Sequence, residues 1–149
     1  MNGDDQHDSP FRYTILIGRP PAAIWQALTQ KEVIDRYFLA PLAVLDLRPG
    51  GRISYGSPQS ECIVGAIIEI EEPHKLVHTF CFAGSAESES VVTYEIVTIG
   101  EAVSSLDITH SGLPRESQVY ADVAAGWPAV ASSMKTLLET GLPLLRAEG

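Results

Sequence analysis

The sequence predicts an α+β fold, in which a curved antiparallel sheet of about seven strands wraps around a long C-terminal helix. Three observations support this prediction. Several segments alternate apolar and polar residues with the two-residue period of a strand. Two short helical segments follow the first strand, and one apolar stripe with helical spacing runs through the last third of the chain. Because the later strands follow one another directly, we expect them to pair as a meander.

The first strand is predicted at residues 11–17, where apolar residues alternate with Arg and Thr. Pro20 and Pro21 then open a helix, because a proline is tolerated in the first helical turn. Thr29 is followed three residues later by Glu32, which is the spacing of a capping box. This spacing predicts that a second short helix begins at Thr29.

From residue 42 onward the hydrophobic period is two, and the turn Pro49-Gly50-Gly51 separates the two strands of a hairpin. In the next strand, alternation predicts an inward face made of Cys62, Val64, Ala66, Ile68 and Ile70. The three strands after it have the predicted inward residues Leu76, His78, Phe80, Phe82, Val92, Tyr94, Ile96, Leu106, Ile108 and His110.

The last third of the chain is predicted to be a helix of about five turns. Its apolar stripe recurs at spacings of three and four and consists of Tyr120, Val123, Trp127, Val130, Met134 and Leu138. Pro128 is expected to kink this helix or to mark its true start. Gly141 and Pro143 are expected to end it.

Length and composition restrict the possible classes of protein. We expect 149 residues to form one domain at residues 11–149, preceded by a disordered polar lead at residues 1–10. The net charge of −9 argues against nucleic-acid binding. No apolar run approaches the length of a membrane span, and the first residues do not form a secretory signal. We therefore expect a cytoplasmic protein in which Cys62 and Cys81 are thiols.

The stretch DITHS contains Asp107, His110 and Ser111, the side-chain types of a hydrolytic triad. Successive strand residues point to opposite faces, so His110 and Ser111 cannot form the bond that activates a nucleophile. His110 is expected to point inward, either as a hydrogen-bonded structural histidine or as a polar group lining a cavity. His74 and His78 are four residues apart on a strand, which is too far for one metal ion.

Several segments together resemble a known family. They are RPPAAIWQALTQKEVIDRYF, LDLRPGGRISY, VGAIIEIEEPHKLVHTF, VVTYEI, LDITHSGLP and AAGWPAVASSMKTLLE, within residues 11–140. In this order they resemble the START-like, or SRPBCC, superfamily and, within it, the family named after the activator of heat-shock-protein-90 ATPase. The resemblance implies a helix-grip fold enclosing a hydrophobic cavity. The family has no shared catalytic motif, and this chain has Tyr37-Phe38 where many relatives have a tryptophan.

The candidate site is the set of inward bulky and polar residues that would line such a cavity. An apolar pocket with a few convergent polar groups is the usual small-molecule site, although each residue could equally be part of the core. The candidates are Tyr55, His78, Phe80, Tyr94, His110, Trp127 and Met134. We assign no catalytic residue, no metal and no cofactor.

Three functions are compatible with the sequence. We expect non-catalytic binding of an apolar or amphipathic small molecule in the cavity, since relatives bind lipids, sterols and polyketides. The first alternative is an enzyme of the cyclase or dehydratase kind, with His and Tyr as acid–base groups. The second alternative is activation of a chaperone ATPase through the surface. We do not expect that contact, whereas a homodimer formed through the sheet edge is compatible with cavity binding.

Overall fold

The computed structural model describes residues 10–57, 59–85, 89–142 and 144. Of the predicted lead at residues 1–10, only Pro10 lies within the described residues. The described part contains the predicted helices and strands in the predicted order. They are β1 (Phe11–Ile17), α2 (Pro21–Thr29), α3 (Lys31–Tyr37), β2 (Leu42–Leu45), β3 (Arg52–Ser57), β4 (Ser60–Glu71), β5 (Lys75–Phe82), β6 (Ser90–Gly100), β7 (Val103–Ser111) and α4 (Gln118–Thr140).

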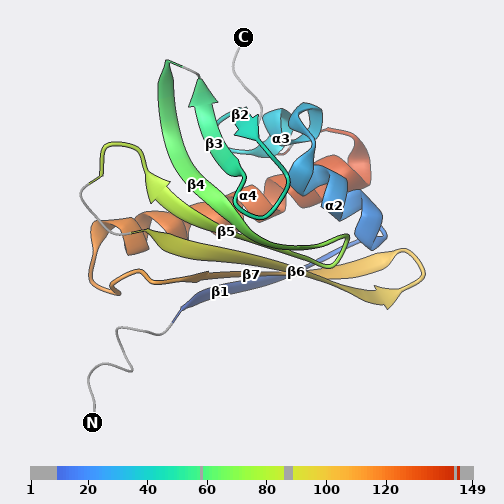
Figure 1. Cartoon of the computed structure of the whole chain (residues 1–149). Helices are drawn as coiled ribbons and strands as arrows, with labels where there is room; N and C mark the ends of the chain where they lie inside the picture. The colour runs from blue at the N-terminus through green and yellow to red at the C-terminus, as the bar shows by residue number, and fades with distance from the viewer. Residues whose placement is uncertain (1–9, 58, 86–88, 143, 145–149) are drawn as a thin grey trace.

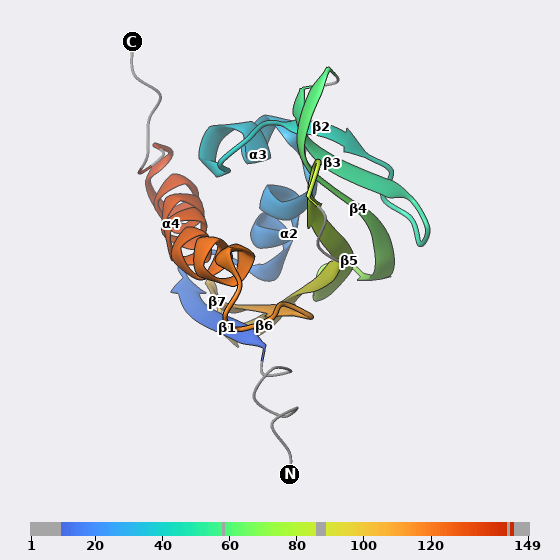
Figure 2. The ribbon, with the colours of Figure 1, turned by 90° about the vertical axis from the view of Figure 1, so that its left-hand side faces the viewer.

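The strands form one antiparallel sheet in the order β1-β7-β6-β5-β4-β3-β2. Strands β2 to β7 therefore form the predicted meander, and β1 pairs with β7 from Phe11 opposite His110 to Ile17 opposite Ser104. The sheet curves around α2 and α3, and α4 lies along its open side (Figures 1 and 2). This arrangement confirms the helix-grip fold.

Helix α4 buries the apolar stripe that the sequence predicts. It begins after Ser117, whose hydroxyl accepts a hydrogen bond from the backbone N–H of Tyr120, and it ends at Gly141 in the left-handed conformation. Pro128 lies inside the helix, so the prediction that it could mark the true start is wrong. The buried residues of α4 are Val123, Trp127, Val130, Ala131, Ser133, Met134 and Leu137.

The predicted inward face of β4 is wrong over most of the strand. Ile63 and Ile67 are buried, whereas Cys62 and Ile68 are exposed. The cause is a bulge in the pairing with β5. Ile67 lies opposite His78 and Glu69 lies opposite Val77, so β4 advances by two residues where β5 advances by one. A bulge reverses the alternation, so only the residues after it, such as the partly buried Ile70, follow the predicted parity.

The predicted capping box at the start of α3 is also wrong. Thr29 is the last residue of α2, and its hydroxyl donates a hydrogen bond of 2.8 Å to the carbonyl of Trp25. Gln30 precedes α3 and makes no side-chain capping bond. The hydroxyl of Thr29 is thus used within its own helix, which a spacing rule cannot detect.

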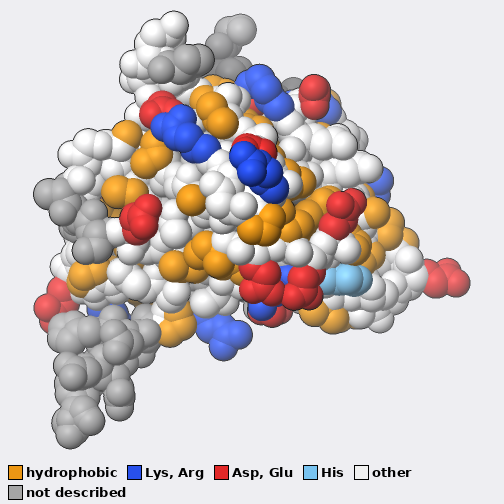
Figure 3. All heavy atoms as spheres, viewed as in Figure 1, with side chains coloured by type: hydrophobic (Ala, Val, Ile, Leu, Met, Phe, Trp, Pro, Cys, Tyr) orange, Lys and Arg blue, Asp and Glu red, His pale blue; other side chains and the backbone are white. Residues whose placement is uncertain are grey.

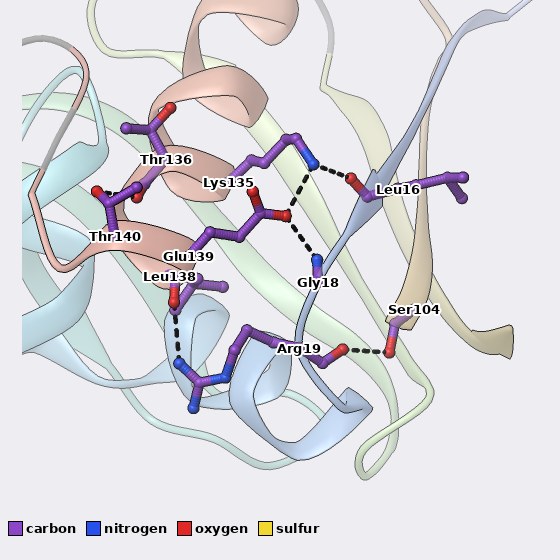
Figure 4. Close-up of polar contacts among 9 residues, drawn as sticks. All are labelled: Leu16, Gly18, Arg19, Ser104, Lys135, Thr136, Leu138, Glu139 and Thr140. Carbon is purple, nitrogen blue, oxygen red and sulfur yellow. Dashed lines mark hydrogen bonds and ion pairs between the residues drawn. The ribbon is translucent and has the colours of Figure 1, made fainter. Parts of the chain in front are cut away.

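A group of polar contacts fixes the end of α4 to the turn between β1 and α2 (Figure 4). The ammonium of Lys135 donates to the carbonyl of Leu16 at 2.7 Å and pairs with Glu139 at 2.8 Å. Glu139 also accepts a hydrogen bond of 2.6 Å from the backbone N–H of Gly18. The bonds from Lys135 and Gly18 lower the pKa of Glu139. These contacts fix the position of α4 along the sheet.

None of the helices in the described residues is both long enough and apolar enough to cross a membrane.

Candidate functional site

A surface pocket lies between α4, strands β4 and β5, and the segment that follows α3. Its lining is apolar except for one carboxylate, that of Asp122. The cavity volume is about 50 Å³, and about 10–15 Å³ of such space holds one water molecule. The pocket therefore admits a small apolar group as it stands. The lining residues are Phe38, Leu39, Ile63, Phe80, Phe82, Asp122, Val123, Gly126, Trp127 and Val130.

Two of the seven predicted site residues, Phe80 and Trp127, line this pocket. The other five are buried in the core and do not line it: Tyr55, His78, Tyr94, His110 and Met134. Sequence reasoning missed Phe38 and Leu39, which follow α3, and Asp122 on the flank of α4. The apolar triplet Tyr37-Phe38-Leu39 at the end of a helix was the available signal for the first two.

His110 is the centre of a buried hydrogen-bond chain that joins α4 to three strands. The indole N–H of Trp127 donates to Nδ1 of His110 at 3.0 Å, so the proton of this histidine lies on Nε2. Nε2 then donates to the hydroxyl of Ser90 at 2.7 Å, and that hydroxyl donates to the carbonyl of Phe80 at 3.1 Å. Of the two roles left open for His110, the structure supports the hydrogen-bonded structural histidine.

His78 is equally buried but only half satisfied. Its Nδ1 donates to the carbonyl of Thr79 at 2.7 Å, which leaves Nε2 as an acceptor. Among the described residues, Nε2 has no hydrogen-bond partner. Burial lowers the pKa of His78 to about 4. The hydrogen bond to Thr79 raises this pKa, but its effect is smaller than that of burial. Burial and the charge of His78 likewise lower the pKa of His110 to about 4.

Three tyrosines, Tyr37, Tyr55 and Tyr94, are buried in the core, and Tyr94 packs against His78. Tyr37 donates from its hydroxyl to the carbonyl of Ala27 at 2.6 Å. The rings of His78 and Tyr94 lie 5.7 Å apart. Burial raises the pKa of Tyr37, Tyr55 and Tyr94, and the proximity of Tyr55 raises it further for the other two.

Two of the rings that line the pocket pack against buried tyrosines. Phe38 stacks on Tyr55 with ring centroids 4.4 Å apart, and Trp127 meets Tyr94 edge to face at 5.9 Å. Phe38 is only partly buried and Leu39 is 64% exposed.

The triad residues of DITHS lie on opposite faces of β7, as the alternation predicts. His110 is buried, while Asp107 faces outward and accepts a hydrogen bond from the hydroxyl of Thr14 on β1. Ser111 is not in contact with His110 in a nucleophile–base pair. Within the described residues, no group of three His, Cys, Asp or Glu side chains could hold a metal ion.

The family model described as Activator of Hsp90 ATPase homolog 1-like protein matches residues 19–139. This range includes α2, α3, β2 to β7, all of α4 except its last residue, Thr140, and all residues that line the pocket. The chain belongs to this Hsp90-activator-like family. No curated protein matches the chain at a significant level.

Solved structures of this Hsp90-activator-like fold are similar over nearly the whole chain. An HSP90 activator from Plasmodium falciparum has 26% identity and a TM-score of 0.76, covering 91% of this chain and 98% of that one. The Aha1 dimer from Colwellia psychrerythraea has 16% identity and a TM-score of 0.75, covering 89% and 97%. CalU16 from Micromonospora echinospora has 20% identity and a TM-score of 0.73, covering 89% and 77%.

Proposed function

We propose that this protein binds an apolar small molecule, or the apolar part of an amphipathic one, in the pocket between α4 and the sheet, without catalysis. The observation that carries the proposal is the lining of the pocket, which is apolar apart from Asp122 and opens at the surface beside Leu39. Apolar surface in a concave site is the usual basis of small-molecule binding. Ligands larger than a small group would displace Phe38 and Leu39.

The cyclase or dehydratase alternative has less support. An acid–base residue must reach the substrate directly or through one water. Both ring nitrogens of His110 are already bonded to Trp127 and Ser90, and neither His78 nor His110 lines the pocket. In the described residues the pocket presents only Asp122 as a titratable group.

The proposal is tested with 1-methylnaphthalene, an uncharged probe, in two-dimensional NMR titrations of the protein. We expect chemical-shift changes centred on Phe80, Val123 and Trp127. Gly126 lies at the mouth, where an added Cβ would lie 3.7 Å from Leu39. Gly126→Leu should therefore obstruct the mouth and weaken binding at least roughly tenfold, a loss of about 1.4 kcal/mol.

The matched control is Ala125→Leu, which adds a leucine at the neighbouring, exposed position of α4. This variant should bind the probe as the wild type does. Absence of shifts at the pocket up to the solubility of the probe would overturn the proposal, as would equal weakening by both leucine variants.

Stimulation of a chaperone ATPase is a second candidate, because the Plasmodium falciparum structure at 26% identity is an HSP90 activator. The charge of −9 would suit a basic partner, but acidic and basic side chains are interspersed on the face shown in Figure 3. We expect excess protein to leave the Hsp90 ATPase rate of the same organism unchanged. A several-fold stimulation that weakens as salt is added would support this second function instead.

A homodimer is compatible with either function and stays a prediction for this chain, as does its place in the cytoplasm. A dimer has been solved for the Colwellia psychrerythraea relative. In the present fold β1 and β2 are the two edge strands of the sheet, the position at which such pairing would occur.

A further inference from the structure

The wall that α4 contributes to the apolar pocket carries one charged side chain. Asp122 lies one helical turn before Gly126 on the same face of α4, and both residues line the pocket. Asp122 is exposed, whereas its neighbour in the lining, Val123, is buried. Asp122 therefore belongs to the rim of the pocket, between the apolar wall and the solvent.

The carboxylate of Asp122 is held in place but has no cationic partner. Its Oδ1 accepts a hydrogen bond of 2.9 Å from the side-chain amide of Gln118, one turn earlier on α4. Among the described residues, no Lys or Arg forms an ion pair with Asp122. Within this part of the chain, Oδ2 is thus open to a ligand.

The rest of the lining is uncharged and favours a cation over an anion. Four of the lining residues have aromatic rings: Phe38, Phe80, Phe82 and Trp127. The face of an aromatic ring attracts a cation, because its π electrons give it a negative potential. The net charge of −9 acts in the same direction over longer distances.

We propose that the pocket selects organic cations: the apolar body of the ligand fills the pocket, and a protonated amine at its end pairs with Asp122 at the rim. The inference rests on the proposed function and names its ligand class. Because Asp122 is exposed, the ammonium group can pair with it and keep part of its hydration. A carboxylate in the same place would meet a like charge, and a hydroxyl would gain no charge pairing.

The test compares three probes built on the naphthalene ring: 1-naphthylmethylamine, which is protonated at neutral pH, 1-naphthylmethanol and 1-naphthoate. We expect the wild type to bind the amine about threefold more tightly than the alcohol at low salt, as one exposed charge pair allows. The naphthoate anion should bind more weakly than the alcohol. Equal binding of the amine and the alcohol would overturn the inference and leave the proposed function intact, as would tighter binding of the anion. Failure of all three probes and of 1-methylnaphthalene to bind would overturn both.

One variant assigns the preference to Asp122. Asp122→Asn keeps the shape of the side chain but removes its charge, and it should reduce the preference for the amine to near unity. The matched control is Glu101→Gln, which removes one negative charge from the exposed turn between β6 and β7. This turn lies at the opposite end of β6 from Ser90, which pairs with the pocket residue Phe80, so the control should keep the preference. A preference that persists in Asp122→Asn, or that falls equally in both variants, would overturn the inference.

Two measurements on the wild type do not depend on the folding of any variant. In the complex with 1-naphthylmethylamine, nuclear Overhauser effects should connect the methylene next to the ammonium with the Cβ protons of Asp122. Added salt should reduce the preference for the amine over the alcohol, since ions screen an exposed charge pair. A bound amine whose methylene makes no contact with Asp122, or a preference that does not change with salt, would overturn the inference.

Discussion

Lowering the pH from 7 to 5 is expected to lower the free energy of unfolding by about 4 kcal/mol, about 2 kcal/mol for each of His78 and His110. In the folded protein, burial lowers the pKa of both histidines to about 4, whereas an unfolded histidine titrates near about 6.5. Between these values the unfolded chain binds more protons than the folded one. The stabilisation is therefore complete above the unfolded pKa and is lost progressively as the pH falls toward 4.

Urea unfolding at pH 7, 6 and 5 measures this dependence. His78→Phe should show about half of the wild-type loss, because only His110 then titrates. Glu139 does not contribute to the change between pH 7 and 5. Its pKa is lowered in the folded protein, so its stabilisation is lost only when the pH falls below the usual pKa of a carboxyl. A free energy of unfolding that is constant from pH 7 to 5 would show that both histidines are solvated in the folded protein.

The order of the elements could be predicted because each one has a local pattern. The alternation of Tyr94, Ile96 and Leu106 with polar residues identifies half-buried strands, and the spacing of Trp127, Val130 and Met134 identifies the buried face of a helix. These patterns depend only on neighbouring residues. They fail where a strand is apolar on both faces, as in β4, because the bulge near Ile68 then leaves no trace in the alternation.

The candidate site was predicted only in part, because its geometry depends on contacts between distant elements. The hydrogen bonds that occupy both ring nitrogens of His110 come from Ser90, twenty residues away, and from Trp127 on α4. No local pattern gives either partner. Phe38 and Leu39 lie outside the regular elements, so no periodicity indicates that they reach the mouth of the pocket. Outside β4 the sequence therefore predicted the inward side chains, but it could not predict which of them line a pocket.

Gly65→Ala is expected to lower the free energy of unfolding by on the order of 3 kcal/mol, because the added carbon has no room. A Cβ at this position in β4 would lie 1.9 Å from the carbonyl oxygen of Thr79 on β5. To relieve this overlap the two strands must separate. Separation would weaken the 2.9 Å bond from the N–H of Ala66 to the hydroxyl of Thr79 and displace the carbonyl that accepts from His78. Thermal and urea unfolding measure the loss.

The control is the same substitution in α4, Gly126→Ala. There the nearest atom to an added Cβ is Leu39 Cδ1 at 3.7 Å, an ordinary contact. Alanine is favoured over glycine inside a helix, so this variant should raise the free energy of unfolding by about 0.5–1 kcal/mol. The two glycine substitutions should therefore change stability in opposite directions. Because Ile63 and Phe80 line the pocket from β4 and β5, Gly65→Ala should also weaken binding of 1-methylnaphthalene. A loss of stability below about 1 kcal/mol in Gly65→Ala would show that β5 can move away from β4 at little cost.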